Sequence, residues 1–164
     1  MSANGTMKRS IDASAQLNFA AAAVALGGIL GFAGVYLNWF KYSYPVSGGS
    51  IVVYLLGNSD WTGQVAFIAG LAAFAFGIAY VLLSDRQIRT ITAALMGVGG
   101  IFLLAMSLLA FSRIDEAVGA APFTPGVLPG VPVAITQAPA GGLWMSVVGG
   151  VIAVYGAFLA LRRT

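Results

Sequence analysis

The sequence predicts an all-α membrane protein, a bundle of four transmembrane helices made of two helical hairpins with two long external loops. Of the 164 residues, 59% are hydrophobic and only 8% are charged, whereas a soluble domain carries about 25% charged residues. Four separate stretches are close to the ~20 apolar residues that one membrane crossing needs. Because these stretches take up about half of the chain, we expect a single membrane domain over residues 1–164.

The first predicted span covers residues 17–37 and follows a short polar segment that contains Lys8 and Arg9. A secretory signal also has basic residues before an apolar core, but that core is ~7–15 residues long and ends at a small-residue cleavage site. This stretch is longer and ends in Asn38 and Trp39, residues that suit a membrane interface. We therefore expect a retained helix.

The first external loop, residues 39–62, has turn signals at Pro45 and at its glycines. Between these turns, residues 51–56 are rich in β-branched and aromatic side chains, which favours a short strand. The alternative is a segment that lies flat in the membrane interface. The second predicted span then covers residues 63–83.

The third predicted span covers residues 91–111, and the short connection before it forces the second and third spans to run antiparallel. The second external loop covers residues 113–141 and contains five of the six prolines of the chain. The fourth predicted span covers residues 142–161. No proline lies inside any of the four spans.

Most of the second loop, residues 117–140, carries no charge, whereas a solvated linker is usually rich in polar residues. Its prolines reduce the entropy that is lost when the segment is fixed in one path. We therefore expect an ordered docking segment that lies on a partner or on the bundle. The side chains that we expect to be buried there are Phe123, Val127, Leu128, Val131 and Ile135.

The distribution of Lys and Arg predicts the orientation, because basic loops stay in the cytoplasm. Six of the eight basic residues lie in the two termini and in the short connection between the second and third spans: Lys8, Arg9, Arg86, Arg89, Arg162 and Arg163. Only Lys41 and Arg113 lie on the other side. We expect a multi-pass protein of the cell membrane, with both termini cytoplasmic and both long loops external.

Glycines mark the expected helix contacts, because helices in lipid associate through small residues. The second and fourth spans each carry glycines at a spacing of seven residues, which keeps them on one face: Gly63, Gly70, Gly77, Gly142, Gly149 and Gly156. Gly27 and Gly31 form a similar pair in the first span. These faces pack within the bundle or, as the alternative, against another subunit.

The two predicted hairpins also look related in sequence. A shift of 72 residues places Gly27 and Gly28 on Gly99 and Gly100, and a shift of 79 places the glycines of the second span on those of the fourth. Chance matching of glycine-rich apolar helices is the alternative explanation. If the repeat is real, both hairpins point the same way and any pseudo-twofold axis runs along the membrane normal.

The sequence predicts no catalytic residue, no metal and no cofactor. It contains no cysteine and no histidine, which removes thiolate ligands, the usual haem ligand and the commonest general base. No Asp, Glu, Lys or Arg lies inside a predicted span, whereas proton-coupled transport generally needs such a group. Basic residues are too few and too evenly spread for nucleic-acid binding. We expect no enzyme.

Aromatic residues cluster at the external ends of the spans, among them Trp39, Phe40, Trp61 and Trp144. Trp and Tyr prefer the headgroup level, so an aromatic belt explains the cluster. A surface that binds a lipid, a quinone or a partner would use the same residues. Together with Phe123 and Leu128 of the second loop, they are the candidate contact residues.

Residues 37–40 at the exit of the first span, residues 142–144 at the entry of the last and the Arg-Arg end resemble small four-helix membrane proteins of actinobacterial type. The resemblance implies the fold and no activity. We expect a non-catalytic accessory subunit of a larger membrane complex, respiratory or otherwise energy-converting, with membrane lipids and other subunits as partners. The alternative is a small lipid- or quinone-binding membrane protein or carrier.

The orientation is testable because the chain has no cysteine of its own. A cysteine introduced at Ser47 should react with a membrane-impermeant thiol reagent in intact cells, whereas one at Ser2 should react only after the membrane is opened. Labelling of the Ser2 variant in intact cells would reverse the orientation.

Overall fold

The computed structural model describes the backbone of residues 3–46, 48–114 and 136–162. Side chains are described in these ranges from residue 19 onward, except at residue 46. The predicted burial of the apolar side chains in residues 117–135 lies outside the described residues.

Four helices make up most of the described chain: α1 (Ala3–Val35), α2 (Trp61–Leu82), α3 (Arg86–Ser112) and α4 (Gly141–Leu161). The last three are long and apolar enough to cross a membrane, and the described apolar part of α1 is the shorter stretch Phe19–Val35. The helical backbone of α1 begins well before the expected span. Its end at Val35, short of residue 37, leaves room for the turn into a strand.

Aspartates fix where two of the helices begin. The Asp60 carboxylate accepts a hydrogen bond from the backbone N–H of Thr62 at the start of α2, at 3.2 Å. The Asp85 carboxylate accepts one from the N–H of Ile88 in the first turn of α3, at 3.0 Å. Such caps satisfy backbone donors that have no partner inside the helix, and Asp85 explains why α3 begins five residues before the expected span.

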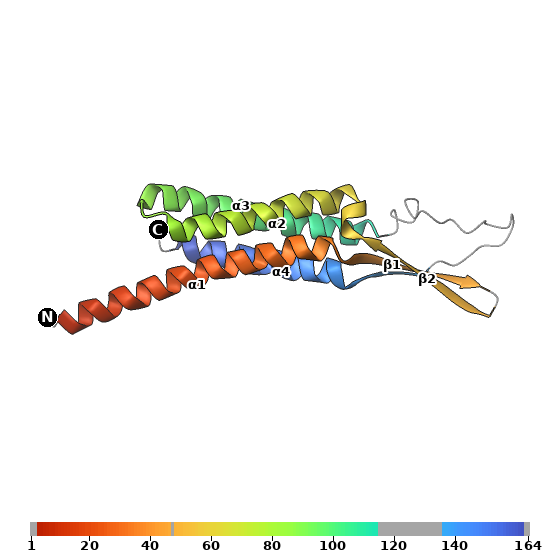
Figure 1. Ribbon diagram of the computed structural model, residues 1–164, viewed down its shortest axis with the longest axis horizontal. Coiled ribbons are helices and arrows are strands. Elements are labelled where there is room, and N and C mark those ends of the chain that lie inside the picture. The colour runs from red at the N-terminus through yellow and green to blue at the C-terminus, as the bar shows by residue number, and fades with distance from the viewer. Residues whose placement is uncertain (1–2, 47, 115–135, 163–164) are drawn as a thin grey trace.

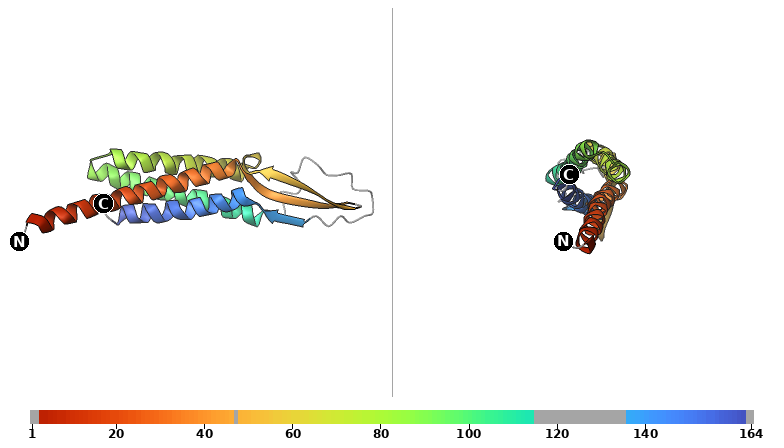
Figure 2. Two further views of the ribbon diagram at one scale, coloured as in Figure 1. Left: turned by 60° about the horizontal axis from the view of Figure 1, so that its bottom comes forward. Right: turned by 90° about the vertical axis from the view of Figure 1, so that its left-hand side faces the viewer.

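The four helices form a closed ring in chain order (Figure 1). Helix α1 packs against α2 and α4, and α3 packs against the same two helices, whereas the diagonal pairs barely touch. The end-on view shows this square arrangement, with the N-terminal part of α1 extending beyond it (Figure 2). The bundle thus consists of two antiparallel helical hairpins, α1–α2 and α3–α4, that pack side by side.

The buried positions of the two hairpins repeat. Seven buried positions of α1 recur in α3 exactly 72 residues later: Ala20, Ala21, Val24, Gly27, Gly28, Gly31 and Val35. The eight buried positions of α2 recur in α4, but 80 residues later, so that Gly70 corresponds to Gly150. The predicted shift of 79 aligned the glycines and is wrong by one residue, because burial follows the helix face rather than the residue type.

A small antiparallel sheet extends from one end of the bundle along its long axis (Figure 1). It contains β1 (Asn38–Val46), β2 (Gly49–Leu56) and β3 (Thr136–Pro139) in the order β2-β1-β3. The short strand expected at residues 51–56 is confirmed and is part of β2. Gly48 in the β1–β2 turn has a φ of 96°, which glycine adopts without strain.

Strand β1 was not expected, since Pro45 suggested a turn. Strand β3 pairs only with residues Phe40 to Ser43 of β1. One edge of β1 is therefore free of described pairing at Pro45, and proline is tolerated at such an edge. The alternation in β1 of buried Phe40, Tyr42 and Tyr44 with half-exposed Lys41 and Ser43 is the signal that identifies it as a strand.

Because α1 and α2 are closely packed, the effect of a glycine-to-alanine substitution on stability should depend strongly on its position. At Gly70 this group would lie 2.8 Å from the backbone nitrogen of Phe32, whereas at Gly97 its nearest neighbour is a side chain 3.6 Å away. We expect Gly70→Ala to lower the free energy of unfolding by about 1–3 kcal/mol through overpacking, and Gly97→Ala to be neutral or stabilising. Thermal unfolding of the purified variants in detergent measures both, and equal stabilities would contradict the packing described.

Candidate functional site

The interior of the bundle contains few polar side chains. Among the described residues, the buried ones are Thr62, Thr92, Ser107 and Ser146. Thr92 and Ser107 donate to the carbonyl four residues earlier in their own helix, each at 2.8 Å. Ser146 donates to the carbonyl of Gly31 on α1 at 3.1 Å. Each of these three hydroxyls has a backbone acceptor, and the one from Ser146 joins two helices, α4 and α1.

The described residues contain no group of three or more Cys, His, Asp or Glu side chains that could hold a metal ion. The expected helix-packing glycines instead bring backbones together. A methyl group at Gly27 would lie 2.5 Å from the carbonyl oxygen of Gly149, and one at Gly149 would lie 2.6 Å from that of Gly27. Helices α1 and α4 are thus in direct backbone contact.

Most of the other predicted glycines also face α1. A methyl group at Gly77 would meet the backbone of Ala25, and one at Gly156 would meet the carbonyl of Ala20. Gly142 lies against Gly34 in the same way. The alternative in which these stripes face another subunit does not hold for these positions, because α1 already occupies the space beside them.

Two predicted glycines have other neighbours. A side chain at Gly31 would overlap Leu103 of the diagonal helix α3, so Gly31 makes room for the buried Leu103 inside the ring. Gly63 lies against the carbonyl of Gly57 in the short 3-10 turn Gly57–Ser59 before α2. The lack of a side chain at Gly63 therefore lets this turn lie directly against the start of α2.

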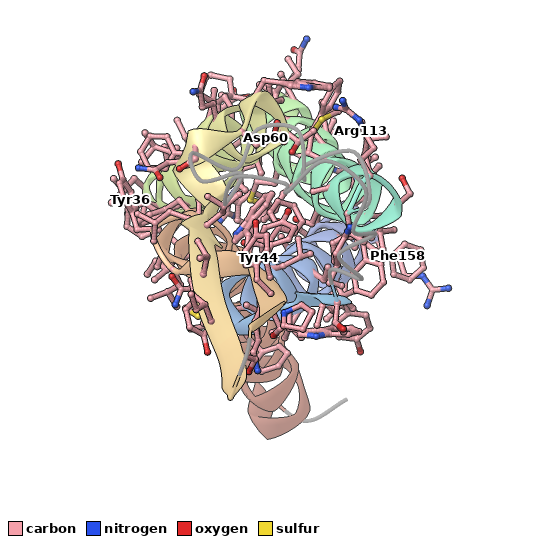
Figure 3. All side chains as sticks on the ribbon, turned by 90° about the vertical axis from the view of Figure 1, so that its right-hand side faces the viewer. Tyr36, Tyr44, Asp60, Arg113 and Phe158 are labelled. Atoms are coloured by element: carbon pink, nitrogen blue, oxygen red, sulfur yellow. The ribbon has the colours of Figure 1, made fainter. Side chains whose placement is uncertain are left out.

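The sheet covers the bundle through four aromatic side chains, here called the aromatic cap: Trp39, Phe40, Tyr42 and Tyr44. All four are at most 2% exposed, and they cluster with buried residues from all four helices. The view from the sheet end shows Tyr44 over the middle of the ring (Figure 3). The aromatic cap thus closes this end of the bundle.

Two of the expected contact residues are part of the aromatic cap, which corrects their assignment. Trp39 donates from its indole nitrogen to the carbonyl of Gly34 at 3.0 Å, and its ring fills the space beside Gly57, which has no side chain. Phe40 packs edge-on against Trp39. Both are buried, so neither Trp39 nor Phe40 presents a surface to lipid or to a partner.

The other two tryptophans are half-exposed, Trp61 at 49% and Trp144 at 51%. The Arg113 guanidinium lies 5.6 Å from the centre of the Trp61 ring. Phe111 packs edge-on against Trp144, with 5.3 Å between the centres of the two rings. Both tryptophans lie in the first turn of a helix at the sheet end of the bundle, the position that an aromatic belt requires. Phe123 and Leu128, the other expected contacts, lie outside the described residues.

Tyr42 and Gln137 form a cross-strand pair of β1 and β3, and each has a buried polar oxygen without a hydrogen-bond partner in the structure. Burial raises the pKa of Tyr42 from 10.0 to about 12, with further contributions from Tyr44 and from Asp60. The sequence gives no signal for this arrangement, because it depends on which face of an unexpected strand is covered.

A shallow apolar groove of about 420 Å³ lies between α1 and α4 on the outside of the ring. It is lined by Phe19, Ala22, Ala23, Leu26, Val151, Ile152 and Tyr155. The lining of the groove is apolar apart from the Tyr155 hydroxyl and contains no charged side chain.

No model of a known protein family matches the chain, and the comparison with curated proteins found no match. The resemblance to small four-helix membrane proteins of actinobacterial type therefore stays a prediction.

The buried Tyr42 hydroxyl predicts a loss of stability at alkaline pH. Between pH 10 and about 12 the unfolded chain loses this proton while the folded protein keeps it, so the unfolded state is increasingly favoured as the pH rises. We expect Tyr42→Phe to remove part of this loss and to change the free energy of unfolding at pH 7 by less than about 1 kcal/mol, since no hydrogen bond is broken. The half-exposed Tyr54→Phe is the control, and equal alkaline unfolding curves for the two variants would contradict the assignment.

Proposed function

We propose that this protein is a non-catalytic accessory subunit of a larger membrane protein complex, respiratory or otherwise energy-converting, that crosses the cell membrane with four helices. The observation that carries the proposal is the combination of a closed apolar bundle with a sheet that projects from one end of it (Figure 1). Such a molecule offers surfaces to lipid and to other proteins.

The outer faces of all four helices support insertion into a bilayer. Large apolar side chains there are 38–65% exposed in their central parts, among them Leu26, Ile29, Ile68, Ile101, Phe102, Val148 and Val151. A surface of this kind is unfavourable in water and suits a membrane. Helix α1 packs between α2 and α4, so it would lie at the depth of these two apolar helices.

The charges at the two ends support the orientation. Arg86, Arg89 and Arg162 lie at the end of the bundle opposite the sheet, and the N-terminal end of α1 lies on that side as well (Figure 1). Lys41 and Arg113 lie at the sheet end. Under the positive-inside rule, the termini would be cytoplasmic and the sheet would project from the outer face of the membrane.

A second candidate function is a small lipid- or quinone-binding membrane protein or carrier. The groove between α1 and α4 favours it, because an apolar surface of this size can hold part of a lipid tail. The groove faces outward between two helices, where bulk lipid would also fill it. The accessory subunit is therefore the leading proposal.

Gentle detergent extraction from native membranes, followed by native mass spectrometry, tests the two proposals. We expect this chain in an assembly with at least one other membrane protein at fixed stoichiometry. As the control, the same chain expressed without the other subunits of the assembly should be found alone. A lone protein that retains one tightly bound lipid or quinone would contradict the accessory-subunit proposal and support the alternative.

A further inference from the structure

We propose that the groove between α1 and α4 binds one acyl chain of an anionic phospholipid of the cytoplasmic leaflet, whose headgroup lies at the basic end of the bundle. This inference rests on the proposed membrane insertion and orientation, and not on a partner subunit. The groove lies on the outside of the ring and its lining carries no charge. Its origin, its depth in the bilayer and the charges beyond it favour this occupant.

The groove exists because α1 carries alanine where the rest of this seam carries leucine. In the sheet half of the seam, Leu30 and Leu37 lie against glycines of α4. A methyl group at Gly149, for example, would lie 3.1 Å from the Cβ of Leu30. Seven residues before Leu30, on the same face of α1, the chain has Ala23, which lines the groove. The far half of the seam is therefore left open by the missing side-chain volume.

The groove is as deep as one leaflet. Helix α4 has 21 residues, which is ~31 Å at 1.5 Å per residue and close to the thickness of the hydrocarbon core. Val151, at the sheet-side end of the groove, is ten residues from Gly141 and ten from Leu161, so it lies at the bilayer midplane. An acyl chain reaches from the headgroups to this depth, whereas a transmembrane helix of another subunit would need a groove across the full thickness.

Arg162 continues the face of α4 that lines the groove. It follows Tyr155 by seven residues, or about two helical turns, toward the end opposite the sheet. Its side chain is exposed, and its guanidinium lies 4.4 Å from the centre of the Phe158 ring. Helix α4 contains no acidic residue. Arg162 therefore places a positive charge at the headgroup level, directly beyond the groove.

Helix α1 adds two positive charges at the same end, because it extends beyond the end of α4 (Figure 2). The last turns of α4 lie against Ala20, so the end of α4 is level with about residue 15 of α1. Lys8 and Arg9 are six or seven residues farther out, ~10 Å along the helix and next to the headgroup layer. Asp12 is the one acidic residue of α1, so positive charge is in excess. Basic clusters beside transmembrane helices attract anionic lipids.

Native mass spectrometry of the purified chain with added lipid tests the proposal. The probes are phosphatidylglycerol and phosphatidylcholine with identical acyl chains, so that the two lipids differ in headgroup charge. We expect one phosphatidylglycerol molecule to remain bound at collision energies that remove all other lipids. Its apparent affinity should exceed that of phosphatidylcholine at least about fivefold.

Substitutions separate the groove from the charge. Ala23→Leu introduces the side chain that Leu30 has in the sheet half, and it should abolish the retained lipid without lowering the thermal stability in lipid-free detergent. Ala75→Leu, on the exposed outer face of α2, is the matched control and should leave binding unchanged. Arg162→Gln should weaken phosphatidylglycerol binding about fivefold and leave phosphatidylcholine binding unchanged, whereas Arg86→Gln, at the same end but on α3, should have no effect.

Equal binding of the two lipids by the parent chain, or a retained lipid in the Ala23→Leu variant, would overturn the proposal, because bulk lipid gives either result. The accessory-subunit proposal would stand, since it depends on whether other proteins co-purify. If Ala23→Leu releases another protein from the assembly extracted from native membranes, the groove holds a partner subunit and the choice of a lipid is wrong. Release of the chain from membranes by alkaline carbonate would show that it does not cross the bilayer and would overturn both proposals.

Discussion

The contact of α1 with both of its neighbours at two consecutive glycines determines the rest of the structure. Gly27 lies against the carbonyl of Gly149 on α4, and Gly28 lies against that of Gly70 on α2. Adjacent residues on a helix point about 100° apart. One pair of consecutive glycines therefore allows the backbone of α1 to contact the backbones of two different helices. The equivalent pair in α3, Gly99 and Gly100, faces α2 and α4 in turn. The core inside this ring is rich in alanine and also contains larger side chains such as Met96 and Leu103.

The same helix also positions the sheet. Helix α1 ends at Val35 and the chain enters β1 at Asn38. The indole of Trp39 donates back to Gly34 in the last turn of α1, and its ring lies against Gly57, which begins the turn into α2. Strand β1 is therefore held between the ends of two helices. Tyr44 of this strand lies over the ring (Figure 3), and β2 lies at one edge of the described sheet.

Composition and periodicity were sufficient to predict helices α2, α3 and α4 to within a few residues and to place a strand at residues 51–56, because long apolar stretches and β-branched runs are strong local signals. Strand β1 pairs with the adjacent β2 and with the distant β3, and Pro45 within it suggested a turn rather than a strand. Trp39 and Phe40 were expected at a surface, but aromatic residues suit a membrane interface and a protein core equally well. Whether these two side chains are exposed or buried depends on the bulge and the register of β1, which the local sequence does not show. The proposed role as an accessory subunit has no local pattern in the sequence, because contacts with other subunits need no fixed motif.

A double-mutant cycle at Gly27 and Gly149 tests the backbone contact on which this account depends. Each methyl group would collide with the carbonyl of the other residue, so Gly27→Ala and Gly149→Ala should each destabilise the protein. Once the first methyl group has separated α1 from α4, the second costs less, and the free-energy change of the double variant should be at least about 1 kcal/mol smaller than the sum of the two single changes. Additive effects would show that the two glycines act independently and that α1 and α4 are not in contact there.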